Sequence, residues 1–138
     1  MKYGYRVVAL VAAPIPLVLL TGCTFGERYA IFDREAEPAD APPELSDQVL
    51  DDIDVDSVRF ATEYEGERLY LAKTSDPSGG ICLLIDAPGD DGVSTGCSEN
   101  GSWFGIEIRY EYHVHPDGTP LPDDVYTDLT ENISVKTG

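Results

Sequence analysis

The segment Ser57-Val-Arg-Phe-Ala-Thr-Glu-Tyr64-Glu-Gly-Glu-Arg-Leu-Tyr-Leu-Ala-Lys73 decides the fold that the sequence predicts. Up to Tyr64, larger side chains alternate with polar or small ones, which indicates a half-buried β-strand. Glu65-Gly66 is a good two-residue turn, and residues 68–73 form the returning strand. The segment therefore predicts an antiparallel hairpin.

A second hairpin follows at Ile81-Cys-Leu-Leu-Ile85, a nearly continuous apolar run that indicates a strand covered on both faces. Residues 93–98 return the chain and bring Cys82 opposite Cys97. In an exported protein an even pair of cysteines favours a disulfide. Two thiols or a metal pair are the alternatives, and the spacing of 15 with no histidine nearby argues against zinc.

Trp103 to His115 is the longest strand candidate. Its alternation predicts one face with Phe104, Ile106, Ile108, Tyr110, Tyr112 and Val114, and another with Trp103, Glu107, Arg109, Glu111, His113 and His115. Residues 120–131 read as a loop with one or two helical turns, and residues 133–135 as a short last strand.

A short helix is predicted before the first hairpin. Ser46 is a plausible N-cap, and Leu45, Val49, Leu50 and Ile53 share one helical face. The fold class expected is α+β, with this N-terminal helix packed on a small antiparallel sheet of about five strands that includes one disulfide-linked hairpin. The expected core contains Val58, Phe60, Leu69, Leu71, Leu83, Ile85, Ile106, Ile108 and Tyr110.

The first 22 residues have the order of a secretory signal peptide. Lys2 and Arg6 precede the uncharged run 7–20, and the small residues Thr21 and Gly22 follow it. The run of 14 residues is shorter than a membrane-spanning helix needs, and it contains two prolines. An uncleaved anchor and a signal cut elsewhere are the alternatives.

Leu20-Thr21-Gly22-Cys23 resembles the lipobox of bacterial lipoproteins. The resemblance implies a lipid on Cys23 and anchoring in the cell membrane on its extracytoplasmic face, with more than one acyl chain for stable attachment. Residues 23–43, rich in proline, alanine and acid, are expected to form a flexible tether. Residues 44–138 are then a single extracytoplasmic domain.

Further short stretches are similar to small lipoproteins and membrane-anchored proteins of actinobacteria. They are Asp56-Ser-Val-Arg59, Glu65-Gly66, Leu69-Tyr-Leu-Ala72, Gly80-Ile-Cys-Leu-Leu84, Gly96-Cys97 and Leu129-Thr-Glu-Asn-Ile-Ser-Val135. This resemblance supports the disulfide-linked hairpin and a Gram-positive host. It implies no activity and no catalytic residue.

The chain is strongly acidic. After removal of residues 1–22, seven Lys and Arg side chains stand against 26 Asp and Glu side chains, a net charge of −19. Such a domain has no basic patch for nucleic acid. The charge either attracts cations or a basic partner, or serves solubility.

Two groups of residues are candidate metal ligands. His113-Val-His115 places two imidazoles on one strand face near Glu111, although zinc needs a third ligand. Asp52, Asp54 and Asp56, within the run 51–56, occupy the first alternate positions of an EF-hand count, but Ser57 stands where that loop needs glycine. Solvated carboxylates and an exposed polar face are the simpler interpretations.

Nucleophile-elbow, HExxH, Walker and dinucleotide-binding motifs are absent from the sequence. The sequence thus predicts a lipid-anchored, non-enzymatic binding or interaction module without a cofactor. A metal- or cation-binding module is the alternative. An enzyme with dispersed residues would require a pocket that gathers carboxylates with His113 or His115.

Overall fold

The computed structural model describes residues 27–89 and 92–138. The predicted signal peptide and Cys23 lie outside these residues. Two 3-10 turns, one helix and eight strands follow one another: η1 Ala30–Asp33, η2 Pro38–Asp40, α1 Asp47–Asp52, β1 Ile53–Tyr64, β2 Glu67–Thr74, β3 Ile81–Asp86, β4 Val93–Ser98, β5 Phe104–Glu107, β6 Glu111–Val114, β7 Tyr126–Asp128 and β8 Ile133–Lys136.

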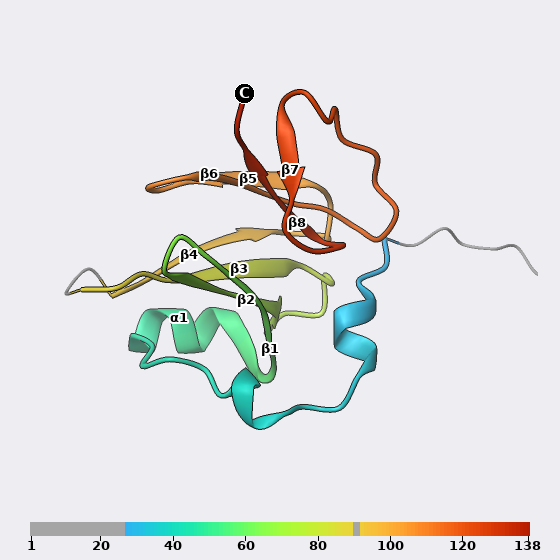
Figure 1. Ribbon diagram of the computed structural model, residues 1–138. Coiled ribbons are helices and arrows are strands. Elements are labelled where there is room, and N and C mark those ends of the chain that lie inside the picture. The colour runs from blue at the N-terminus through green and yellow to red at the C-terminus, as the bar shows by residue number, and fades with distance from the viewer. Residues whose placement is uncertain (1–26, 90–91) are drawn as a thin grey trace, which may run out of the picture.

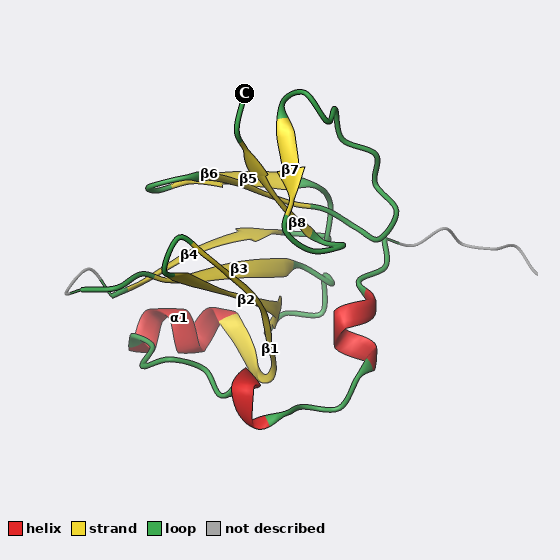
Figure 2. Ribbon diagram, viewed as in Figure 1, coloured by secondary structure: helices red, strands yellow, loops and turns green. Residues whose placement is uncertain are grey.

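The strands form two antiparallel sheets of four strands each. Sheet A has the order β1-β2-β3-β4, and sheet B has the order β5-β6-β8-β7. Figure 1 shows the two sheets stacked one above the other, with α1 on the far side of sheet A. The prediction of an α+β domain is therefore wrong: the described chain is mostly β, and its only α-helix has six residues (Figure 2).

The main core lies between the two sheets. Leu69 and Leu71 of β2 and Leu83 of β3 pack there against Tyr112 and Val135 of sheet B. Alternate residues of the same strands, including Tyr70 and Leu84, form a second cluster on the other face of sheet A. Sheet A is thus covered on both faces, as the apolar run of β3 predicts.

The second cluster is covered by the segment around α1. Leu45 and Val49 pack against it, which confirms that a short helix contacts the sheet. Ser46 precedes the helix, but its side chain makes no capping hydrogen bond. Leu50 is exposed instead of packed, and Ile53 is buried as the first residue of β1.

Both predicted hairpins of sheet A are confirmed. Glu65 and Gly66 have φ angles of 50° and 85°, and the primed two-residue turn at the end of β1 requires such positive values. In the second hairpin Cys82 pairs directly with Cys97, and the two form a disulfide. The disulfide cross-links two residues of sheet A that are 15 positions apart in the sequence.

The segment Trp103 to His115 is a hairpin and not one long strand. The chain turns at residues 108–110, and Phe104 pairs with Val114 while Ile106 pairs with Tyr112. Because the members of each pair have numbers of the same parity, the alternation continues unbroken through the turn, and the sequence pattern cannot reveal it. Ile108 lies in the turn and is 55% exposed, so its assignment to the core is wrong.

Residues 120–131 contain one hydrogen-bonded turn, in which the Pro122 carbonyl accepts the N–H groups of Val125 and Tyr126, and then the edge strand β7, which was not predicted. The last strand, β8, confirms the one predicted at 133–135 and lies between β6 and β7. Within the described residues, no helix combines the length and the apolar character that crossing a bilayer requires.

Candidate functional site

The outer face of sheet B carries the two histidines that the sequence marked as candidates, together with Glu111. Tyr112, Val114, Ile133 and Val135 point into the core, so their neighbours along the strands point outward. We call this surface the outer face; its side chains are Trp103, Glu111, His113, His115, Tyr126, Asp128, Ser134 and Lys136. The sequence alternation predicted the shared face of Trp103, Glu111 and the two histidines.

Three aromatic rings form a row on the outer face. The His113 ring lies between Trp103 and Tyr126, with centroid distances of 4.8 Å and 4.7 Å. Gly105 on β5 makes room for it, because a Cβ atom there would lie 3.1 Å from His113 Cε1. His113 is buried by this packing, whereas Trp103 remains 46% exposed. Trp103 is therefore a large apolar surface presented on a rigid support.

A charged pair borders the aromatic row. Glu111 lies with one carboxylate oxygen 2.8 Å from His113 Nε2 and accepts a hydrogen bond of 3.0 Å from Lys136 Nζ with the other. These contacts, that of His113 first, hold the pKa of Glu111 below its usual value. His113 Nδ1 is buried without a hydrogen-bond partner. The Glu111 carboxylate thus links the ring to the exposed cation.

His115 takes part in a different chain of contacts. Its Nε2 lies 2.9 Å from the Ser134 hydroxyl oxygen, and that hydroxyl donates to Asp128 Oδ1 at 2.6 Å. In a serine nucleophile triad the histidine stands between serine and carboxylate. Here the serine stands between the other two and is fully buried. The arrangement ties β7 and β8 to the end of β6 and does not present a nucleophile.

The predicted metal ligands are not brought together. His113 and His115 direct their Nε2 atoms to Glu111 and Ser134 respectively. Asp52 ends α1, and Asp54 and Asp56 lie in β1, on the side of the molecule away from sheet B. Across residues 27–89 and 92–138, no group of three or more His, Cys, Asp or Glu side chains is placed to hold a metal ion.

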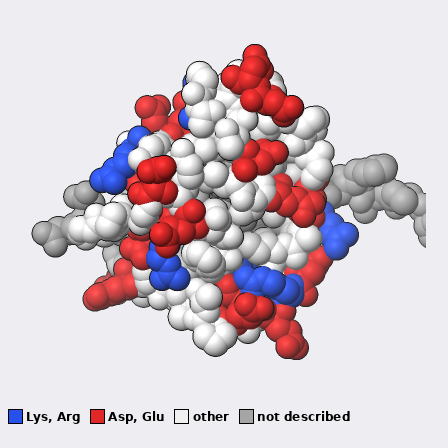
Figure 3. Space-filling view, viewed as in Figure 1, with Lys and Arg blue, Asp and Glu red and all other residues white. Residues whose placement is uncertain are grey.

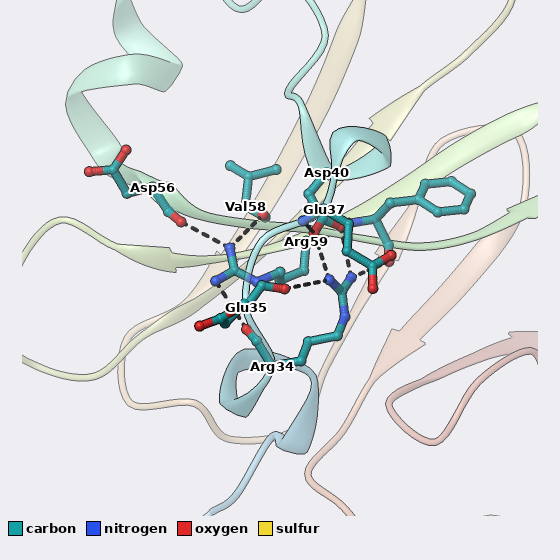
Figure 4. Close-up of polar contacts among 8 residues, drawn as sticks. Arg34, Glu35, Glu37, Asp40, Asp56, Val58 and Arg59 are labelled. Atoms are coloured by element: carbon teal, nitrogen blue, oxygen red, sulfur yellow. Dashed lines mark hydrogen bonds and ion pairs between the residues drawn. The ribbon is translucent and has the colours of Figure 1, made fainter.

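A second polar cluster fixes the N-terminal segment to sheet A. Asp40 is buried and accepts two hydrogen bonds from Arg34, of 2.6 Å and 2.7 Å (Figure 4). The same carboxylate accepts backbone N–H groups of Glu37 and Phe60, each at 2.7 Å. The Arg34 guanidinium, followed by the two N–H donors, lowers the pKa of Asp40 far below its usual range. The sequence gives no signal for this role of one acid among 26.

The neighbouring Arg59 completes this cluster. Its guanidinium donates to the backbone carbonyls of Asp56 and Val58 at 2.9 Å and to that of Arg34 at 3.4 Å. The predicted flexible tether, residues 23–43, is therefore docked along much of its described part. Arg34 to Asp40 lies against the edge strand β1.

A buried carboxylate joins the two sheets. Glu67 on β2 is fully buried and accepts a 2.6 Å hydrogen bond from the Tyr112 hydroxyl on β6. Its other oxygen has no hydrogen-bond partner, and Arg109 Nε lies 3.9 Å away. Burial, then Glu67, raises the pKa of Tyr112, so the phenol stays protonated and remains a donor. The Glu67–Tyr112 hydrogen bond is therefore part of the core and does not belong to a surface site.

Comparison of the chain with protein-family models, with curated proteins and with solved structures finds no match.

Proposed function

We propose that the protein is a lipid-anchored extracytoplasmic binding module of the cell membrane, without an enzymatic activity of its own, that engages a partner through the outer face of sheet B. The anchor rests on the order of residues 1–23, which ends in Cys23. The binding role rests on the described domain.

One observation carries the binding role: the exposed Trp103 ring packs against the buried ring of His113. Tryptophan is enriched in recognition sites, because its ring supplies a large contact area with few rotatable bonds. The contact with His113 fixes the ring before a partner arrives, which lowers the entropy lost on binding. Lys136 and Glu111 beside it supply polar contacts that give orientation.

The surrounding chemistry also favours binding over catalysis. The two histidines, the usual proton carriers of hydrolytic sites, have Nε2 atoms engaged with Glu111 and Ser134. A general base must reach the proton it removes, and both rings are buried. The exposed elements of this face are instead an aromatic ring, an ion pair and the carboxylate of Asp128, which accepts the Ser134 hydroxyl.

The lipid anchor is tested by Cys23→Ala in the native host, with Cys82→Ala as a matched control. We expect Cys23→Ala to be released into the medium or to stay unprocessed, because only Cys23 follows the signal sequence directly. Cys82→Ala should remain with the membrane fraction and incorporate labelled fatty acid. Membrane retention and normal processing of Cys23→Ala would refute the anchor.

The binding face is tested by photocrosslinking in intact cells. Benzoylphenylalanine replaces Tyr126 on the outer face in one variant and the exposed Leu50 on α1 in the other. We expect a discrete crosslinked species with the probe at position 126 only, because the two positions lie on opposite sides of the molecule. The same adducts at both positions, or none at position 126, would argue against a partner on sheet B.

A further inference from the structure

The docked N-terminal segment fixes the place where the chain leaves the domain. The Tyr29 hydroxyl donates to the Gly101 carbonyl at 2.8 Å, and the Asp117 carboxylate accepts the Ala30 N–H at 3.0 Å. The Asp117 N–H in turn donates to the Arg28 carbonyl at 2.8 Å. Arg28 is thereby held beside the loops at one end of both sheets. We call this end, with residues 28–33, 79, 101–103 and 117, the anchor-side end.

The distance from this end to Cys23 is limited by covalent geometry. Arg28 is five residue steps from Cys23, and a fully extended chain spans at most about 3.6 Å per step, or about 18 Å here. A flexible tether through residue 43 would allow roughly 70 Å by the same rule. Because Tyr29, Ala30 and Asp40 are held against the sheets, that longer reach is not available while the segment stays docked.

Trp103 lies at the anchor-side end. It immediately precedes β5, and the Gly101 carbonyl two residues earlier accepts the Tyr29 hydroxyl. Ile108 follows the last residue of the same short strand and is likewise exposed. The five residue steps from Trp103 to Ile108 correspond to roughly 17 Å along a strand. The two exposed apolar side chains therefore mark opposite ends of sheet B.

We infer that the anchor-side end rests on the phospholipid surface, so that lipid is the partner that Trp103 of the outer face contacts. Trp103 then lies in the boundary between headgroups and acyl chains, and Ile108 is directed away from the membrane. The inference rests on the proposed lipid anchor at Cys23. Tryptophan is the residue that favours this boundary, because its ring is apolar and its indole N–H is a donor.

The surface of the anchor-side end fits zwitterionic headgroups. A hollow of about 430 Å³ lies there, and its lining includes the cations Arg28 and Lys73 and the acids Glu27 and Asp33. Arg28 Nη2 donates to Asp33 Oδ2 at 2.7 Å. Lys73 Nζ lies 5.2 Å from the centre of the Phe32 ring. The hollow thus carries equal numbers of cations and acids, one pair of them already joined, so it can contact both the phosphate and the ammonium group of a zwitterionic headgroup. A purely anionic surface would instead be repelled by the net charge of −19 that the chain has after removal of residues 1–22.

Fluorescence of the full-length, lipid-modified protein in phosphatidylcholine vesicles tests this orientation, because Trp103 is the only tryptophan of the chain. We expect its emission to shift to shorter wavelength relative to the unlipidated domain, and to be quenched by lipid brominated near the acyl carboxyl end. The matched probe combines Trp103→Phe with Ile108→Trp. Its emission should stay that of a water-exposed indole and should escape quenching.

Vesicle flotation separates the two proposals. Protein that floats while Trp103 is not quenched, or while both probes are quenched equally, overturns the orientation and leaves the anchor intact. Protein that does not float overturns the anchor and the orientation with it. Replacing half of the lipid by phosphatidylglycerol should weaken the quenching of Trp103. Equal or stronger quenching would overturn the assignment to zwitterionic headgroups.

Discussion

Sheet A and sheet B differ in how they are covered and in what they expose. Sheet A has strands of 12, 8, 6 and 6 residues, both faces covered, and a disulfide between its last two strands. The strands of sheet B have only three or four residues, and one face carries Trp103 and Lys136 into solvent. Sheet A thus supplies stability, while sheet B holds exposed functional side chains on a rigid support.

Figure 3 shows acidic side chains spread over the visible face, with a few basic ones among them.

The sharpest test of this contrast compares a core leucine of sheet A with the turn of sheet B. Leu83→Ala should lower the free energy of unfolding by about 4 kcal/mol, because it leaves a cavity between the sheets. Ile108→Ala should change it by no more than about 0.5 kcal/mol, since Ile108 is exposed. Urea denaturation measures both. A large loss of unfolding free energy in Ile108→Ala would show that Ile108 is buried in the core.

The disulfide should have the next largest effect. The double variant Cys82→Ala with Cys97→Ala should lose about 3 kcal/mol in urea denaturation, as expected for a loop of this size. Wild-type protein denatured with a reductant should approach the same midpoint. An unchanged midpoint would show that strand pairing alone holds β3 to β4.

Removal of the Tyr112 hydroxyl tests the link between the sheets. Tyr112→Phe should cost about 2 kcal/mol, because the buried Glu67 carboxylate then lacks its hydrogen-bond donor. A second variant that adds Glu67→Leu should recover part of this loss, since no buried charge remains unpaired. Additive losses in this double-mutant cycle would contradict a direct coupling.

Acid should selectively weaken the N-terminal clamp on sheet A. The pKa of Asp40 is lower in the folded chain than the usual value of about 4 for an unfolded aspartate. Its contribution is therefore fully present above that usual value and is lost as the pH falls toward the folded pKa. Asp40→Ala should cost about 1.5 kcal/mol at pH 7, and the difference from wild type should shrink below about pH 4. A pH-independent difference would contradict this.

Sequence reasoning worked where the determinants were local. The alternation up to Tyr64, the Glu65-Gly66 turn and the apolar run at 81–85 each specify one element of sheet A without help from distant residues. The cysteine pair also predicted which residues of β3 and β4 lie opposite each other. The strands of sheet B were predicted less well. The turn at Ile108 preserves the alternation of the pattern and so hides the β5–β6 hairpin, and β7 has only three residues, too few to form a pattern.

The candidate site was predictable only in part for the same reason. Trp103 and His113 share the odd-numbered positions of one continuous pattern, so their common face could be read from the sequence. Tyr126 joins them through the pairing of β7 with β8, which no local pattern encodes. Likewise Asp40 contacts Phe60 from 20 residues away, and Tyr29 contacts Gly101 from 72 residues away. Because these contacts are with distant residues, the composition of residues 23–43 alone predicted a flexible tether.

The clamp at Asp40 has a consequence for neighbouring copies of the chain. β1 is an edge strand of 12 residues, long enough to recruit a foreign strand through its unpaired backbone groups. Asp40 occupies the Phe60 N–H at this edge, and register shifts between Asp54 and Arg59 and between Phe60 and Thr62 disturb its regularity. If the chain is anchored as proposed, its copies are confined to a membrane plane and meet at a raised effective concentration. Blunting this edge would keep such crowded copies from joining into a shared sheet.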